Sequence, residues 1–426
     1  NDIDFRSRPY SEEETSFLSS SALGLKTTYK DIDKADQVVL LGFEPEEESP
    51  IVFLRIYKQF RKRALKVVSD APVASRGSVK LNAELVSDIK AIPGLTAKSV
   101  ILVGERLSEK VGALSSAVEL VEKSGAKLAW IPRRAGERGA LAAGAIGTLL
   151  PGGRPVSEAS ARVDVAAAWS VDSLPTEPGR STSEILHALV VNNLDAVVIG
   201  GVDPLDISSD ALSQLLNSFV VSLEITHSAV TAVADVVLPV AAVIEKSGSF
   251  QDWQGSTRKF DKAVADSLSR SDVRILSMIA DEMGAPINLP TVAATAREIS
   301  ALGNWDGKAL AFEKTSEIKT AIADGKLNLT SWRMLLDLGT LQEGEEHLAG
   351  TARRTVAVIS PKRAQSMGVV DGDQLRISTA QGSVTLSALV ENIHDDAVWA
   401  PRNSRGSQLL VNLGVAHGAV VTVVKA

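Results

Sequence analysis

The sequence contains no cysteine among its 426 residues. Without a thiol, this stretch of chain can form no disulfide, no thiolate-held iron–sulfur cluster, no zinc site of the cysteine type and no cysteine nucleophile. The absence of cysteine leaves the redox compartment of the protein open, and nothing else in the sequence argues for secretion.

Long apolar runs and a positive net charge are missing as well. No uncharged apolar run approaches the roughly 18 residues that span a bilayer; the nearest candidate, residues 220–244, contains Glu224, Asp235 and Pro239. The net charge is -7 and the pI is near 5.5, which disfavours nucleic acid or an anionic membrane as partner. The chain begins at Asn1 with neither Met nor an apolar signal segment, so we expect a fragment or a processed form.

Short apolar runs alternate with helical patterns in the first part of the sequence. Residues 37–43 (QVVLLGF), 99–104 (SVILVG) and 126–132 (AKLAWIP) are predicted to be buried strands. A helix with a basic end is expected from Pro50, and a further helix-like stretch near residues 83–92. The alternation predicts an α/β fold in which helices wrap a parallel sheet.

A second α/β region and a β-rich region follow. A Pro/Gly/Ser-rich stretch marks a boundary near residues 150–183, and from Arg354 the pattern changes to β-branched strands separated by tight turns. This change predicts a small β-barrel at the end of the chain. The length suggests two or three domains. We place a first αβα domain at residues 1–165, a second with peripheral helices at 166–349, and the barrel at 350–426.

No pattern typical of metal binding or nucleophilic catalysis stands out. The five histidines include no pair spaced for a metal on one helix. His227 follows a predicted strand, but no carboxylate partner is evident, so we assign it a structural role. The glycines of residues 139–147 lack the lysine of a phosphate-binding loop and indicate close helix packing instead. We predict no catalytic residue and no metal site.

The most informative segment is the loop FEPEEESP at residues 43–50. It lies between a strand and a helix, where a nucleotide-binding fold would place a phosphate on the helix N-terminus. Four glutamates occupy this position; they suit the positive end of the helix and are able to cap its free N–H groups. Because the same carboxylates repel a pyrophosphate, we predict a structurally capped loop; a solvated run of charge, the simpler interpretation, agrees with the absence of a pyrophosphate here.

Several motifs resemble the molybdopterin oxidoreductase family, and they occur in the order that the family shows. Residues 33–62 are similar to its strand, Gly-x-x-Pro turn and helix, and residues 227–255 contain its ADVVLP motif. Residues 368–384 and 401–414 resemble its pterin-dinucleotide-binding barrel. The GFEPEEESP version of the turn, together with segments within residues 125–144 and 152–180, resembles the G subunit of bacterial complex I, the NADH-quinone oxidoreductase, particularly that of actinobacteria.

The resemblance implies two αβα parallel-sheet domains plus a double-psi-like β-barrel. It also implies a non-catalytic, cofactor-free scaffold in the peripheral arm of proton-pumping NADH-quinone oxidoreductase, with the other peripheral-arm subunits as partners. Iron–sulfur clusters would lie in a region upstream of Asn1, and the assembly would lie on the cytoplasmic side of the bacterial plasma membrane. Catalytic relatives carry a molybdenum ligand near the position of residues 4–8, where only Ser7 is conceivable here. We therefore expect molybdopterin to be absent.

A fragment of an active molybdopterin oxidoreductase, similar to formate dehydrogenase, is the alternative interpretation. In that case Gly42, Glu44, Asp203 and Asn412 would approach the pterin dinucleotide, and Ser7 would be the metal ligand. In the scaffold interpretation the same four residues are remnants of a pterin pocket. A third possibility, an independent α/β protein that binds a small molecule, shares the fold but has no site to support it.

Overall fold

The computed structural model describes residues 2–318, 322–323 and 325–426. The chain divides into two compact units whose segments interleave along the sequence. Unit 1 comprises Asn1–Arg8, Leu18–Gly24 and Arg134–Phe312, and unit 2 comprises Pro9–Phe17, Leu25–Arg133 and Glu313–Ala426. The first parallel sheet and the barrel therefore share unit 2, whereas the second parallel sheet lies in unit 1.

The sheet of unit 2 has five parallel strands in the order β3-β2-β1-β4-β5. Its central strands, β1 (Gln37–Leu41) and β4 (Val100–Gly104), are buried at every position, as their apolar runs predicted. The outer strands are β2 (Lys66–Asp70), β3 (Glu84–Val86) and β5 (Lys127–Ile131). The helix-like stretch expected near residues 83–92 is wrong: β3 pairs with β2 at the sheet edge, and only the short 3₁₀ helix η2 (Ile89–Ala91) follows.

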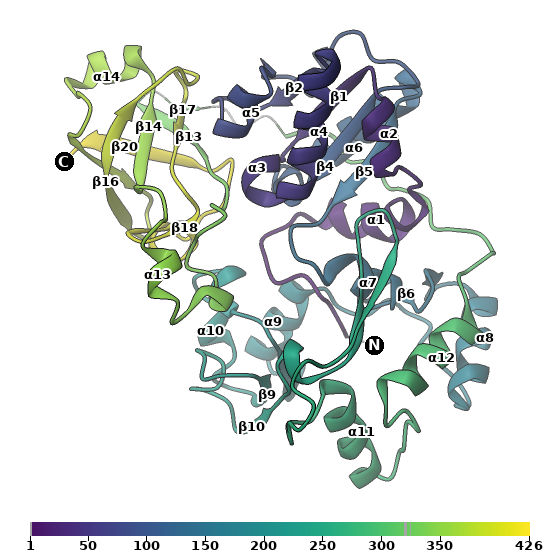
Figure 1. The fold of residues 1–426 in the computed structure, drawn as a ribbon. Helices are drawn as coiled ribbons and strands as arrows, with labels where there is room; N and C mark the ends of the chain where they lie inside the picture. Colours follow the sequence, from purple (N-terminus) through teal and green to yellow (C-terminus); the bar gives the residue numbers. More distant parts are fainter. Residues whose placement is uncertain (1, 319–321, 324) are drawn as a thin grey trace. The chain divides into compact units, whose positions relative to one another are not determined.

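Helices cover this sheet on both faces. The helix α4 (Pro50–Arg63) begins at Pro50, as predicted, and connects β1 to β2. The helix α6 (Ala113–Ser124) connects β4 to β5 on the other side of β1, so right-handed crossovers place the two helices on opposite faces. Figure 1 shows α4 in front of the sheet beside α2 (Tyr29–Lys34). The predicted fold, a parallel sheet wrapped by helices, is confirmed.

The carboxy-terminal strands close into a six-stranded barrel, which confirms the second part of the predicted fold. Its order is β13-β17-β14-β16-β15-β20, with β20 returning to β13. The strands are β13 (Lys326–Thr330), β14 (Val356–Ile359), β15 (Gln374–Ser378), β16 (Ser383–Val390), β17 (Ala397–Trp399) and β20 (Val420–Lys425). Alternating aliphatic side chains such as Leu329, Leu375 and Val398 fill the interior. Strand β13 of the barrel lies before residue 350, where the sequence pattern had predicted the barrel to begin.

Unit 1 contains a parallel sheet of three strands, β8 (Ala196–Gly200), β9 (Phe219–Glu224) and β10 (Val236–Pro239), in the order β10-β9-β8. The second α/β region predicted from the sequence is confirmed. Helices α9 (Thr182–Val190) and α10 (Ala211–Gln214) pack on the sheet around Leu189 and Val220. The peripheral helices are α8 (Ala159–Trp169), α11 (Asp272–Glu282) and α12 (Val292–Leu302). The boundary predicted at residue 165 falls inside α8.

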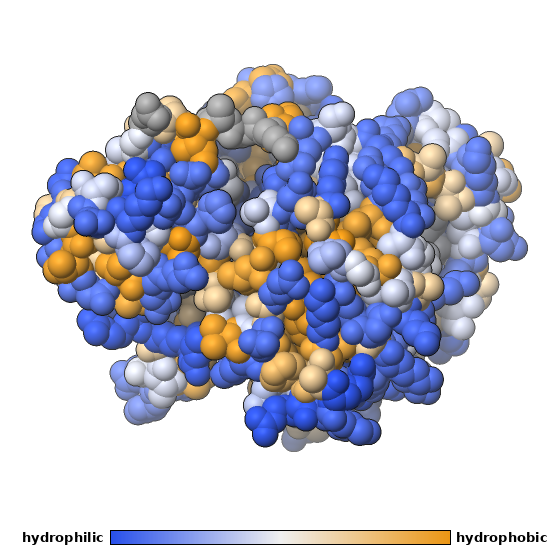
Figure 2. Space-filling view, turned by 90° about the horizontal axis from the view of Figure 1, so that it is seen from above, coloured by the Kyte–Doolittle hydropathy of each residue, from blue (hydrophilic) through white to orange (hydrophobic). Residues whose placement is uncertain are grey.

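One face of the molecule is largely hydrophilic. In the face that Figure 2 shows, charged and polar side chains cover most of the area, and apolar residues gather in patches between them. Within the described part of the chain, no helix is both long enough and apolar enough to cross a membrane.

Candidate functional site

The candidate site lies at the carboxyl edge of the unit 2 sheet, where the chain turns sharply after β1 and β4. Gly42 follows β1 with a φ of +55°, and a Cβ atom at this residue would lie 2.8 Å from the Cα of Leu107. A Cβ atom at Gly104, which ends β4, would lie 2.9 Å from the Cβ of Phe43. Two glycines therefore let the turns after β1 and β4 cross closely, which places Glu44 and Arg106 at the same edge.

Glutamates of the FEPEEESP loop cap the short helix α3 (Pro45–Glu48) that follows. The Glu47 backbone N–H donates to Glu44 Oε2 at 2.6 Å, and the Glu44 N–H donates to Glu48 Oε2 at 2.6 Å. The Ser75 hydroxyl, from the segment after β2, donates to Glu44 Oε1 at 2.5 Å. The predicted capping is confirmed. The solvated charge run is wrong, because Glu44, Glu47 and Glu48 are all buried.

Burial raises the pKa of Glu44 to about 7. The hydrogen bonds from Ser75 and from the Glu47 N–H favour the charged form, whereas the neighbouring charges of Glu48 and Glu47 disfavour it. Glu44 is thus a group that titrates near neutral pH inside a dense carboxylate cluster.

Arg106, in the 3₁₀ helix η3 (Glu105–Glu109) after β4, neutralises Glu48. Its Nε donates to Glu48 Oε1 at 2.8 Å and its Nη2 to Oε2 at 3.2 Å, the paired geometry of a bidentate ion pair. The guanidinium also lies 5.7 Å from the centre of the Trp332 ring. Burial opposes the charge of Arg106, but Glu48 outweighs burial, so its pKa is raised. Arg133, which follows β5, similarly lies 3.2 Å from Glu105.

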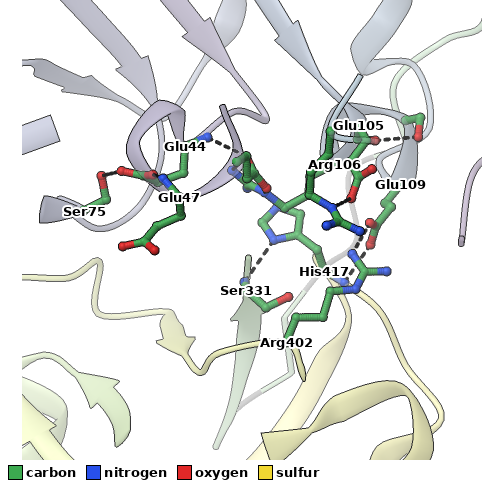
Figure 3. Close-up of polar contacts among 12 residues, drawn as sticks. Glu44, Glu47, Ser75, Glu105, Arg106, Glu109, Ser331, Arg402 and His417 are labelled. Atoms are coloured by element: carbon green, nitrogen blue, oxygen red, sulfur yellow. Dashed lines mark hydrogen bonds and ion pairs between the residues drawn. The ribbon is translucent and has the colours of Figure 1, made fainter. Parts of the chain in front are cut away.

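The barrel supplies the other half of this network (Figure 3). Arg402 forms an ion pair with Glu109, and the His417 backbone N–H donates to the same carboxylate at 2.9 Å. The Ser331 N–H donates to His417 Nδ1 at 3.1 Å, which leaves this nitrogen as an acceptor. Burial, together with the charges of Arg106 and Arg402, lowers the pKa of His417 to about 3. The imidazole is therefore neutral at physiological pH.

Glu47 forms a second contact between α3 and the carboxy-terminal segment, here the stretch that connects β13 to β14. Its Oε2 accepts from the Leu335 N–H at 2.9 Å, and its carboxylate pairs with Arg353. Beside these polar contacts, the Trp332 and Trp399 rings lie 4.8 Å apart in an apolar cluster with Val73 of the sheet segment. Paired charges and packed aromatic rings thus join the sheet edge to the barrel.

The residues predicted for a pterin pocket belong to different parts of the fold. Gly42 and Glu44 lie at this edge, while Asn412 belongs to the barrel helix α15 (Leu409–Leu413), with its backbone carbonyl against Gly382. Asp203 lies in unit 1 and caps the 3₁₀ helix η4 (Pro204–Asp206) by accepting from the Leu205 N–H at 3.0 Å. Ser7 also lies in unit 1, where it is buried.

Sequence reasoning missed the cations and carboxylates that complete the network. A signal for Arg106 and Glu109 was present, because they follow the predicted strand at residues 99–104 and so had to reach the same edge as Glu44. Arg402 and His417 carried no such signal: their carboxylate partner, Glu109, is 293 and 308 residues away along the chain. Among the described residues, no group of three or more His, Asp or Glu side chains is placed to hold a metal ion.

Comparison with known proteins assigns the chain to a family. The model of the molybdopterin oxidoreductase family matches residues 10–282, and that of the molydopterin dinucleotide binding domain matches residues 327–424. The chain belongs to the molybdopterin oxidoreductase family, as its motifs had suggested.

Two curated relatives within this family are similar to the chain over nearly its whole length. The chain is 45% identical to the G subunit of the NADH-quinone oxidoreductase of Mycobacterium bovis over 450 residues, which cover 99% of this chain and 56% of the relative. It is 40% identical to the corresponding G subunit of Streptomyces coelicolor over 471 residues, with the same coverage. The chain thus spans a little over half the length of these curated relatives. The predicted similarity to the actinobacterial G subunit is confirmed.

A solved structure supports the fold alone. Acetylene hydratase from Pelobacter acetylenicus superposes with a TM-score of 0.55 at 11% sequence identity, covering 97% of this chain and 81% of that chain.

Proposed function

We propose that this chain is a structural scaffold within the peripheral arm of a proton-pumping NADH-quinone oxidoreductase. The G-subunit relatives, at 40 and 45% identity over 99% of the chain, carry the assignment to that assembly. In this proposal the partners are the other peripheral-arm subunits, and the assembly lies at the cytoplasmic side of the bacterial plasma membrane.

The scaffold binds no molybdopterin and performs no redox step itself. The observation that carries this point is the bidentate pair between Glu48 and Arg106, both buried at the sheet edge where this family of folds would receive an anionic group. The cations at this edge that a diphosphate would need are already neutralised by carboxylates of the chain, and the Glu44 carboxylate already accepts from the Glu47 N–H of α3. The residues present therefore do not fit a pterin dinucleotide at this position.

In place of a cofactor, internal ion pairs hold the barrel to the sheet. Glu109 with Arg402, and Glu47 with Arg353, each join one residue of the sheet edge to one of the carboxy-terminal segment. The iron–sulfur clusters of the parent subunit belong, in this proposal, to sequence outside these residues, since no cysteine is present.

Co-purification tests the scaffold role. An affinity tag on the parent subunit in its native host is expected to recover the other subunits of the NADH-quinone oxidoreductase in stoichiometric amounts, measured by quantitative mass spectrometry. Recovery of the tagged chain without any of those subunits would contradict the proposal.

A further inference from the structure

The outward surface of α4 carries an apolar and basic stripe that the core does not use. Ile51 and Leu54 are 63% and 56% exposed, and Lys58 and Arg61 continue the stripe toward the helix end. Spacings of three, four and three residues place all four side chains on one face of the helix. The opposite face already packs on the sheet through Val52, Phe53 and Ile56.

The basic residues at the end of α4 are free of ion pairs within the described part of the chain. Among the described residues, Lys58, Arg61 and Lys62 form no ion pair, whereas Arg55, on the flank of the same helix, pairs with Asp33 at 2.9 Å. Basic residues in the last turn favour the helix dipole, which accounts for part of this composition. The dipole does not account for the two large aliphatic side chains, Leu54 and Ile51, which lie about two and three turns before the basic last turn.

The neighbouring helix α5 (Arg76–Lys80) adds to the same surface. The ammonium group of Lys80 lies 5.6 Å from the centre of the Phe53 ring, so α5 lies directly beside α4. This helix presents Val79, which is 68% exposed, and an exposed Arg76. Both helices therefore present exposed aliphatic and basic side chains, on a chain whose net charge is -7.

We propose that this α4/α5 surface, formed by Ile51, Leu54, Lys58, Arg61 and Val79, docks an acidic amphipathic segment of another protein subunit. Aliphatic side chains of the partner lie on Ile51 and Leu54, and its carboxylates face Lys58 and Arg61. Complementary charge fixes the position of the partner segment along α4 and raises its association rate. The aliphatic side chains of both partners supply the buried interface area. The inference rests on the proposed scaffold function and names one surface through which the scaffold binds.

An anionic membrane is the competing occupant of a basic amphipathic helix. The structure favours a protein, because only one narrow side of α4 is available and its inner side is committed to the sheet. Ile51 and Leu54 lie within one turn of this helix, so its exposed apolar face is shorter than the face of several turns that an interfacial helix inserts between lipids.

Site-specific photo-crosslinking in the native assembly tests the proposal. A benzophenone amino acid replaces Leu54 in one variant and Val370, 65% exposed on a barrel turn, in a control. Position 54 is expected to crosslink to a polypeptide segment containing both aliphatic and acidic residues, identified by mass spectrometry. Adding K58E and R61E should lower that yield roughly tenfold at low salt. The matched double change R354E and R376E, at exposed barrel positions, should leave the yield unchanged.

Each other outcome would overturn the docking proposal. Crosslinks from position 54 to lipid would assign the surface to a membrane, and crosslinks to a neutral or basic segment would remove the charge argument. Equal loss with both double changes would show a general effect of charge. Normal recovery of the assembly with no crosslink at position 54 would overturn the docking site and leave the scaffold function standing. Failure of the unaltered chain to recover any subunit would instead contradict the scaffold function.

Discussion

At the scale of single residues, the pair between Glu48 and Arg106 makes the sharpest prediction. Removing the guanidinium with Arg106→Met leaves a buried carboxylate without its counter-ion, which typically costs about 3–5 kcal/mol of stability. The double change with Glu48→Gln should recover most of that loss, because the uncompensated charge is then gone. Urea unfolding of the single and double variants measures both effects; a single variant as stable as the unaltered protein would contradict the structural role of the pair.

The raised pKa of Glu44 predicts the direction in which the free energy of unfolding changes with pH. Its pKa of about 7 in the fold, above the ordinary value of 4.5, means that folding favours the protonated form. The stabilisation from this group is complete below the ordinary pKa and is lost as pH rises through about 7, by up to ~3 kcal/mol. Between pH 4.5 and 7, the difference in unfolding free energy between the unaltered protein and Glu44→Gln should therefore fall with rising pH. A constant difference across that range would contradict the assignment.

At the scale of elements, the tight turn after β1 is the position where the backbone itself is constrained. Gly42→Ala meets both a positive φ and the backbone of Leu107, so we expect a loss of more than ~2 kcal/mol. Gly368→Ala is the matched control. Gly368 has a similar φ of +62°, but no atom lies within 4 Å of the added Cβ, so only the cost of the backbone conformation, about 1 kcal/mol, remains. Equal losses in thermal unfolding would contradict the close approach between the two turns.

The elements were also the level at which sequence patterns predicted most. Apolar runs such as residues 37–43 identified the buried parallel strands, and alternation of side chains identified the barrel. The stretch near residues 83–92 misled because its periodicity is helical, whereas pairing with β2 decides its conformation. The sequence did not predict long-range ion pairs, because local patterns carry no information on which of many charged residues contacts Glu109.

At the scale of the whole molecule, the ion pairs between sheet edge and barrel should decide how firmly the barrel is held within unit 2. Arg402→Met leaves Glu109, whose side chain is 2% exposed, without its counter-ion. We expect faster hydrogen exchange at the barrel strands β13 and β17, which lie beside Ser331, and around His417. Strands β8–β10 of unit 1 serve as the internal control and should exchange as before; a uniform increase across both units would contradict the assigned role.

In the proposed function, carboxylates and arginines of the chain itself occupy the sheet edge in place of a pterin cofactor. Metal analysis by mass spectrometry, with a fluorescence assay for released pterin, measures this directly on the protein purified within its native assembly. We expect neither molybdenum nor tungsten nor pterin above background. Molybdenum or tungsten and pterin in a stoichiometric amount, assigned to this chain, would contradict the proposed function.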